Sequence, residues 1–214
     1  MKINYDIVIP LFAAFAIVML TGPVVIPFLQ KLKLSQTERK EGVQAHLKKA
    51  GTPTMGGVIF LFSILITSLF YVSDYPRIIP VLVLTLGFGV IGFLDDYLKV
   101  VLRRSDGLMP GEKMLGQLIV TTIFVIFLWM MDSSLLELRI PFGLFGVREL
   151  GGPAVKIIAT PLAYLVVIGT VNGVNFTDGL DGLATGVTSM VAVFYLAASA
   201  LLEGRIEPMM AAVL

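Results

Sequence analysis

The sequence predicts an all-α integral membrane protein, built as a polytopic bundle of transmembrane helices. Hydrophobic residues make up 57% of its 214 residues and charged residues only 14%, whereas soluble domains average roughly 45–50% and about 25%. Several apolar segments also approach the ~20 residues that a helix needs to cross the hydrocarbon core of a membrane. The polar motifs lie between these segments, which is the arrangement of spans and loops in a multi-pass membrane protein.

Six apolar segments are long enough to be predicted as complete spans, and a seventh starts near Pro208. The six cover residues 7–29, 55–72, 78–94, 114–131, 155–171 and 183–202. We expect residues 1–214 to form a single transmembrane domain. No cap, polar flank or basic anchor follows the last apolar run, so we also expect this domain to be incomplete at its C-terminus.

Lysine and arginine residues predict the orientation of the spans. Ten of the sixteen lie in segments 31–54, 95–113 and 172–182, and the other six lie on the opposite side. Cytoplasmic loops carry the excess of basic residues, so these three segments are predicted to face the cytoplasm. The charges favour no nucleic-acid partner, because the net charge is only +1 and no basic patch interleaves with aromatic residues. Cysteine is absent, which excludes disulfide and thiol chemistry.

The segment between the fourth and fifth spans predicts a small external β-hairpin at residues 135–147. Apolar and polar residues alternate up to Ile140, and Pro141 to Gly143 supply a turn. An irregular amphipathic loop is an equally good interpretation of this pattern.

The first polar motif is HLKKAGTPTMGG at residues 46–57. Thr52 to Thr54 suggest an N-cap for the second span, and Gly56 and Gly57 would allow another helix to approach closely. Lys48 and Lys49 precede this helix start, where cationic side chains and free backbone N–H groups suit a phosphate. Two interfacial lysines in contact with anionic lipid headgroups are the alternative.

The second motif is GFLDDYLKV at residues 92–100. Asp95 and Asp96 are adjacent, and neighbouring anions repel each other unless a cation or a proton relieves them. Magnesium does so where phosphate substrates are also present, because it binds carboxylate and phosphate oxygens together. Lys99 lies four residues after Asp95 on the same helix face, so a simple ion pair is the alternative. That pair would leave the second aspartate unexplained.

The third motif is VNGVNFTDGLDGLATG at residues 171–186. Asp178 and Asp181 share a face at helical spacing, and Asn172 and Asn175 repeat this spacing earlier in the motif. Glycines at 173, 179 and 182 favour tight backbone turns near a ligand over an ideal helix. Capping of the sixth span would explain one aspartate but not the rest.

Carboxylates, lysines and asparagines on one membrane face indicate magnesium-assisted phosphoryl chemistry, where catalysis is mostly positioning and charge neutralisation. A secondary transporter or channel would instead place charges near the bilayer midplane on broken helices, and a structural scaffold would need no clustered acids.

The three motifs, in this order, resemble those of the polyprenyl-phosphate N-acetylhexosamine-1-phosphate transferase superfamily. GTPTMGG and DDYLK are most similar to the phospho-N-acetylmuramoyl-pentapeptide transferases of peptidoglycan synthesis. The resemblance implies ten transmembrane helices, a homodimer, a cytoplasmic Mg²⁺-dependent active site and a place in the bacterial inner membrane. It also implies transfer of phospho-MurNAc-pentapeptide from its UDP carrier to undecaprenyl phosphate, giving lipid I and UMP. A relative that uses UDP-GlcNAc is the alternative.

The resemblance also assigns residues to roles. Asp95, Asp96 and Asp178 match catalytic positions, with Asp95 the better candidate for deprotonating or orienting the lipid phosphate. The adjacent pair Asp95 and Asp96 would also contribute to the magnesium site, whose main family ligand lies beyond Leu214. The predicted substrate-binding residues are Lys49, Lys99, Lys113, Asn172, Asn175, Phe176 and Asp181.

Overall fold

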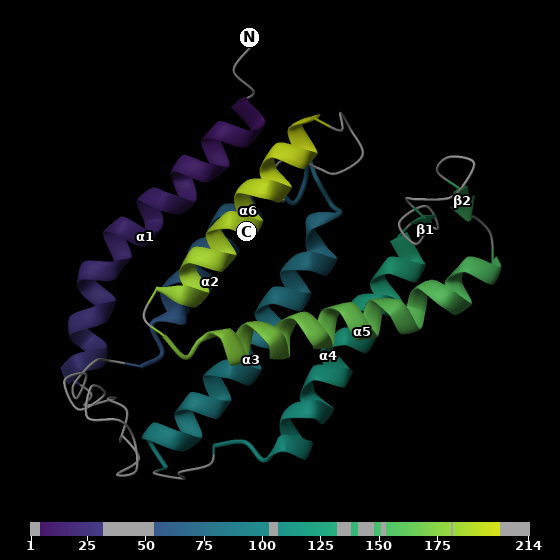
Figure 1. The fold of residues 1–214 in the computed structure, drawn as a ribbon. Coiled ribbons are helices and arrows are strands. Elements are labelled where there is room, and N and C mark those ends of the chain that lie inside the picture. The colour runs from purple at the N-terminus through teal and green to yellow at the C-terminus, as the bar shows by residue number, and fades with distance from the viewer. Residues whose placement is uncertain are drawn as a thin grey trace.

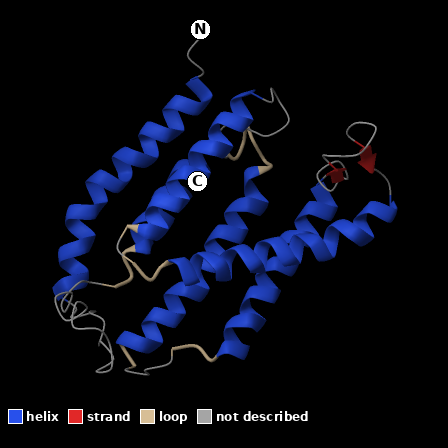
Figure 2. Ribbon diagram, in the orientation of Figure 1, coloured by secondary structure: helices blue, strands red, loops and turns tan. Residues whose placement is uncertain are grey.

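The computed structural model describes residues 5–31, 54–102, 107–131, 138–140, 148–150, 153–180 and 182–201. This part of the chain holds six α-helices and two short strands (Figures 1 and 2). The helices are α1 (Tyr5–Lys31), α2 (Gly57–Tyr71), α3 (Ile78–Val100), α4 (Pro110–Met131), α5 (Pro153–Thr177) and α6 (Leu183–Leu201). The start of the predicted seventh span lies outside the described residues.

The helices form an up-and-down bundle in which each packs mainly against its neighbour in sequence (Figure 1). Four of them are long and apolar enough to cross a membrane, over residues 8–31, 78–100, 110–131 and 156–177. α2 and the described apolar part of α6 are shorter than the predicted spans. The prediction of a polytopic membrane helix bundle is confirmed.

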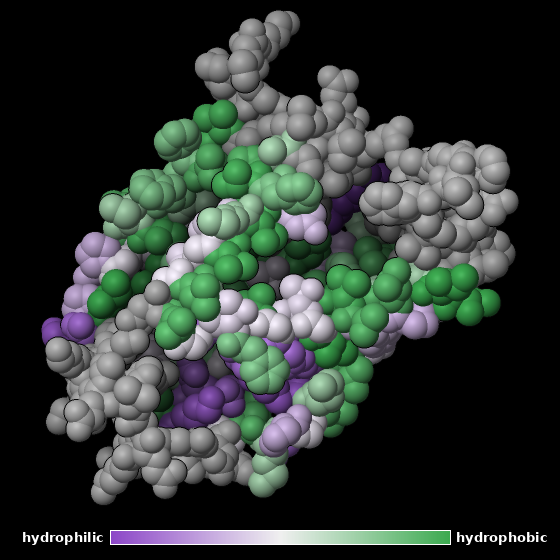
Figure 3. Space-filling view, viewed as in Figure 1, coloured by the Kyte–Doolittle hydropathy of each residue, from purple (hydrophilic) through white to green (hydrophobic). Residues whose placement is uncertain are grey.

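The surface of the bundle suits a lipid environment. Large apolar side chains such as Phe12, Leu20 and Phe70 are exposed, and apolar residues dominate the face shown in Figure 3. Hydrophilic residues gather towards the lower end of that view. Several of the most buried side chains are polar, among them Ser63, Gln117 and Thr121. Polar groups inside a membrane protein need internal partners because lipid supplies none.

Glycines on α3 bring this helix close to both of its neighbours. A Cβ at Gly87 would lie 2.6 Å from the Val120 side chain on α4, and one at Gly89 would lie 2.5 Å from the Leu61 side chain on α2. Small residues allow such close helix contacts in membranes. Across the first helix pair, the Ser63 hydroxyl donates a hydrogen bond of 2.8 Å to the carbonyl of Ala14.

The predicted start of the second span is wrong by two residues. α2 begins at Gly57 with Gly56 as its N-cap and no side-chain cap. The physical reason is Met55, whose φ of 67° is left-handed and interrupts helical geometry just before the cap. Among the described residues none uses the close approach that Gly56 and Gly57 would allow, since a Cβ at either would meet no described atom within 4 Å.

Two predicted loops begin later than expected, because α3 and α5 continue past their apolar runs. α3 reaches Val100, which places Asp95 and Asp96 on its last turns. α5 reaches Thr177, so Gly173 lies inside a helix and not in a turn. The predicted turn is confined to the residues around Gly182, where φ is +79°.

The predicted β-hairpin forms, with its second strand slightly beyond the expected range. β1 (Leu138–Ile140) pairs antiparallel with β2 (Arg148–Leu150), and Arg139 lies opposite Glu149. Figure 2 shows this small ladder at the end of the bundle where α4 finishes and α5 starts. The hairpin therefore lies at the end of α5 opposite to the third polar motif.

Candidate functional site

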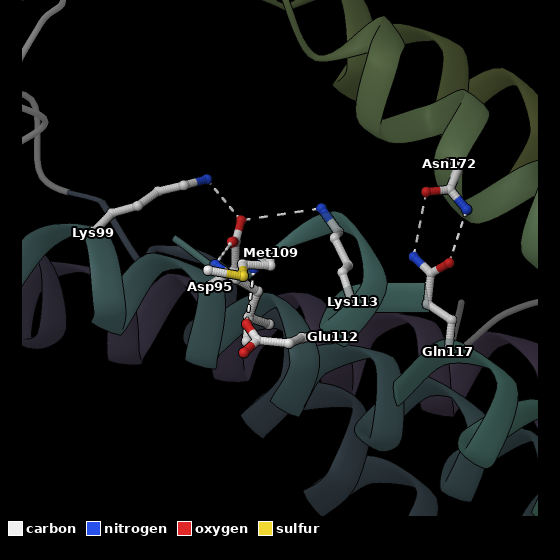
Figure 4. A network of polar contacts seen from close by, with 8 residues as sticks. Asp95, Lys99, Met109, Glu112, Lys113, Gln117 and Asn172 are labelled. Carbon is white, nitrogen blue, oxygen red and sulfur yellow. Dashed lines mark hydrogen bonds and ion pairs between the residues drawn. The ribbon is translucent and has the colours of Figure 1, made fainter. Parts of the chain in front are cut away.

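Asp95 is the centre of a charged cluster between α3 and α4 (Figure 4). Its Oδ2 accepts a hydrogen bond of 2.7 Å from Lys99 Nζ and lies 4.0 Å from Lys113 Nζ. Its Oδ1 accepts a hydrogen bond of 2.9 Å from the backbone N–H of Leu108. The Asp95 side chain is only 12% exposed, so these partners compensate for the loss of water around a charged group.

Two charges of the cluster interact unfavourably with the dipoles of their own helices. Asp95 is near the C-terminal end of α3, where an anion is disfavoured, and Lys113 is in the first turn of α4, where a cation is disfavoured. Each relieves the other across the helix pair. The ion pair with Lys99, which the sequence offered as an alternative to function, is present, but it is one of several contacts rather than the whole explanation.

Gly107 allows the loop before α4 to close over Asp95. Its φ is +63°, and a Cβ at this position would collide with Asp95 Oδ1 and lie 2.6 Å from Lys99 Cε. Only glycine combines this backbone conformation with the absence of a side chain. Gly107 and Leu108 were not predicted as part of the site, although the Asp-Gly pair at 106–107 is a common turn signal.

The start of α4 is fixed by its own residues. Pro110 takes the first helical position, which suits its fixed φ and missing N–H. The Glu112 carboxylate accepts a hydrogen bond of 2.9 Å from the backbone N–H of Met109, as in the reciprocal half of a capping box. This cap holds the turn from which Lys113 points towards Asp95 (Figure 4).

Asp96 differs from its neighbour in having no such partners. Among the residues that the structure describes, none donates a hydrogen bond to Asp96 or forms an ion pair with it. Its carboxylate nevertheless interacts electrostatically with Lys99, Lys113, Asp95 and Asp178. The structure therefore brings Asp178, from the end of α5, into the same electrostatic environment as the adjacent aspartates.

Asn172 lies on α5 and faces Gln117 on α4 (Figure 4). The two side-chain amides bond reciprocally, at 2.9 Å from Asn172 Nδ2 to Gln117 Oε1 and 3.3 Å from Gln117 Nε2 to Asn172 Oδ1. Asn172 Nδ2 also donates to the carbonyl of Ile168 at 2.8 Å. Gln117 was missed by the sequence analysis, because a single glutamine in an apolar helix carries no local signal of its partner.

The remaining predicted residues of the third motif that the structure describes are exposed. Asn175 and Phe176 lie on the last turn of α5, and Phe176 is 86% exposed. Asp178 follows the helix end, where its N–H donates to the carbonyl of Val174. Lys49 and Asp181 lie outside the described residues, as does the predicted phosphate site at Lys48. The substrate-binding and catalytic roles of all these residues stay predictions.

The described side chains of this region could supply only some of the ligands of a metal ion. Within the described ranges, no group of three or more histidine, cysteine, aspartate or glutamate residues could hold a metal ion together. Asp96 supplies a carboxylate that is free of protein partners there. Mg²⁺ is commonly bound through one or two carboxylates plus substrate phosphates and water, so this donor set is compatible with a magnesium ion that a substrate helps to hold.

Comparisons with known proteins agree with the resemblance seen in the motifs. The family model described as "Glycosyl transferase family 4" matches residues 78–214. A second one, "Phospho-N-acetylmuramoyl-pentapeptide-transferase signature 1", matches residues 49–61, which overlap the first motif.

Curated relatives carry the name phospho-N-acetylmuramoyl-pentapeptide-transferase. The chain is 46% identical to the one from Acetivibrio thermocellus over 183 residues, which is 85% of this chain and 53% of the relative. It is 42% identical to that of Clostridioides difficile over 194 residues, or 91% and 58%. For Desulforamulus reducens the identity is 43% over 200 residues, or 90% and 58%.

The chain thus spans a little over half the length of the curated relatives that it matches. The family match covers α3 to α6, which carry the aspartates and lysines of the charged cluster. The chain belongs to glycosyl transferase family 4.

Proposed function

We propose that this chain contributes to an enzyme that transfers phospho-MurNAc-pentapeptide from its UDP carrier to undecaprenyl phosphate, forming lipid I and UMP. The single observation that carries the proposal is the charged cluster between the end of α3 and the start of α4, where Lys99 and Lys113 both pair with Asp95. The names of the relatives and the matched signature supply the substrate class.

The cluster suits two negatively charged substrates that must meet. A UDP-sugar and a lipid phosphate repel each other, and cations between them lower this repulsion. Lys99 and Lys113 come from different helices and converge on one carboxylate. Because both cations already lie at this position, little reorganisation is needed when phosphates arrive, and positioning and charge neutralisation supply most of the catalysis in phosphoryl transfer.

The reaction that we propose is a direct displacement. An oxygen of the lipid phosphate forms a bond to the sugar-bound phosphorus, and the bond from that phosphorus to the bridging oxygen of UMP breaks. Asp95 would deprotonate or orient the lipid phosphate, and Asp96 and Asp178 would act at the same site. Asp95 lies beside both lysines, which would attract the lipid phosphate to it. A two-step route would need an additional aspartyl-phosphate intermediate.

We also propose Mg²⁺ as the cofactor, held in part by Asp96 and Asp95. When bound, the ion would neutralise phosphate charge and orient phosphate oxygens. Asp96 fits this role better than Asp95 in the structure, because Asp95 already accepts two hydrogen bonds from protein groups.

We propose further that the protein is a homodimer in the bacterial inner membrane, with this site facing the cytoplasm. The distribution of lysine and arginine supports the orientation. The ends of α3 and α5 and the starts of α4 and α6 belong to the side of the bundle with the larger number of basic residues.

The direct test uses the protein as its natural gene encodes it, purified in detergent with undecaprenyl phosphate. We expect UMP release with UDP-MurNAc-pentapeptide and Mg²⁺, and none with UDP-GlcNAc. Turnover of UDP-GlcNAc alone would assign the protein to the alternative transferase. Uptake of a solute into proteoliposomes without any UMP release would favour a transporter.

Three substitutions test the assigned carboxylates. Asp95→Asn, Asp96→Asn and Asp178→Asn are each expected to abolish transfer, because a neutral amide neither attracts a cation nor accepts a proton. Near-normal turnover by any of them would show that the role of that residue is wrong. Glu112→Gln is the matched control, since Glu112 is an acid at the same end of the bundle whose hydrogen bond within the described residues is to the N–H of Met109, which a glutamine oxygen can also accept.

A further inference from the structure

The reciprocal amide pair between α4 and α5 is placed in an unusual setting. Gln117 is only 1% exposed, and both helices are apolar enough to cross a membrane. A primary amide without partners is costly in apolar surroundings. Here each amide satisfies the other across 55 residues of sequence, so this contact depends on one particular alignment of the two helices.

On both helices, the pair lies close in sequence to residues of the candidate site. Gln117 lies one turn after Lys113 on α4, and residues four apart share a helix face. Asn172 lies on α5, six residues before Asp178. Both residues also take part in hydrogen bonds within their own helices, because Thr121 donates to the carbonyl of Gln117 at 2.7 Å and Asn172 donates to that of Ile168.

A second hydrogen bond joins the same two helices but lies farther from the candidate site. The hydroxyls of Thr122 and Tyr164 lie 2.7 Å apart at an exposed part of the interface. Because α4 and α5 run in opposite directions, this contact is farther from Lys113 and Asp178 than the amide pair is. It therefore serves as a matched control for hydrogen bonding between α4 and α5 in general.

We propose that Gln117 and Asn172 are positioning residues that set the alignment of α5 on α4 and so fix where the end of α5, with Asp178, lies relative to the start of α4. The effect of this role on catalysis rests on the proposed function, whereas the alignment of the two helices does not. The positioning role also differs from a direct contact between Asn172 and the substrate, because the Asn172 amide already has partners in the protein.

The alignment can be measured without any assay of activity. No cysteine occurs in residues 1–214, so cysteines introduced at Leu115 on α4 and Leu180 after α5 would be the two labelling sites within them. Both side chains are well exposed, at 60% and 67%. Distances between the labels are recorded by pulsed electron paramagnetic resonance on the full protein in nanodiscs.

Four variants of the labelled protein are compared with the labelled protein in which Gln117 and Asn172 are unchanged. Gln117→Leu leaves Asn172 unpaired, and we expect the distance distribution to broaden and shift. Gln117→Leu combined with Asn172→Leu removes both amides, and the distribution should stay broad because no directional contact remains. The exchanged pair, Gln117→Asn with Asn172→Gln, should restore a narrow distribution. Tyr164→Phe should leave it unchanged.

Transfer kinetics form the second arm of the experiment. A misplacement of about 1 Å can cost up to ~100-fold in rate, so Gln117→Leu should lower kcat roughly 10- to 100-fold with little change in KM for the UDP-sugar. The exchanged pair should recover most of kcat. If Gln117→Leu folds poorly, the exchanged pair and Tyr164→Phe still decide the question.

Two results would overturn the proposal. One is a wild-type distance distribution in Gln117→Leu. The other is an exchanged pair with a wild-type distribution but a raised KM, which would make Asn172 a substrate contact. If the distances respond as expected while no variant, nor the wild type, transfers phospho-MurNAc-pentapeptide, the positioning role stands and the proposed function fails.

Discussion

Replacing Gly107 by alanine is expected to disrupt the charged cluster although the change adds only one methyl group. Two separate effects arise from the structure. The φ of +63° is a left-handed conformation that costs a residue with a Cβ roughly 1–2 kcal/mol. The new Cβ would also collide with Asp95 Oδ1 and press on Lys99 Cε at 2.6 Å.

The collision can be relieved only by moving the loop or the carboxylate. Either movement would weaken the hydrogen bond from the Leu108 N–H to Asp95, and a bond to a charged group contributes about 1.5–3 kcal/mol. The Lys99 side chain is partly exposed and can adjust, so we take the loss from its displacement as small. The expected decrease in the free energy of unfolding is therefore about 3 kcal/mol.

The measurement is an unfolding titration with SDS in mixed micelles, followed by circular dichroism. Gly111→Ala is the matched control, because Gly111 lies in the first turn of α4 and a Cβ there would meet nothing within 4 Å. It should be neutral or stabilising by up to about 1 kcal/mol, since alanine favours the helix.

A second substitution at position 107 separates the two effects. Asparagine tolerates left-handed φ better than alanine does, but it has the same Cβ. If the collision with Asp95 dominates, Gly107→Asn should be as unstable as Gly107→Ala, and both should lower UMP release. Wild-type stability and turnover in Gly107→Ala would refute the reasoning.

Three further predictions concern single contacts. Asp96→Asn should leave the unfolding free energy unchanged or slightly raised, because the cost of burying the charge and its repulsion by Asp95 and Asp178 outweigh the lost attraction to Lys99 and Lys113; a large destabilisation would contradict this. Ser63→Ala should cost about 0.6 kcal/mol, a typical value for one interhelical hydrogen bond in a membrane. Ser189→Ala is its control, because that hydroxyl bonds within its own helix. Gly89→Val should separate α2 from α3 and destabilise the fold by roughly 1–3 kcal/mol through overpacking, whereas Gly92→Ala should not; equal stability of these two variants would argue against the close helix contact.

The sequence was sufficient to predict the features that depend on local composition. Apolar runs determine the helices because lipid accepts only backbones that are hydrogen-bonded internally. The short alternation before Pro141 suited a hairpin and an irregular loop equally, and the pairing of β1 with β2 decides for the hairpin. The Asp95 to Lys99 pair could also be foreseen, because residues four apart meet on any helix.

Helix ends were predicted less well, and the reason is physical. Hydropathy marks where apolar residues stop, but α3 and α5 continue because polar side chains on their last turns find partners in the protein. At α2 the opposite occurs, since the unusual φ of Met55 sets the start later than threonine capping would.

What only the tertiary structure decided is how the motifs meet. The Gln117 to Asn172 contact and the interaction of Asp178 with Asp96 join residues far apart in sequence, and no local pattern specifies such partners. The same holds for Gly107, whose importance comes from the carboxylate that it faces. The sequence by itself determined a membrane helix bundle with three polar motifs. Helix packing determined which charges share a site, because side chains on different helices meet only when the helices are aligned.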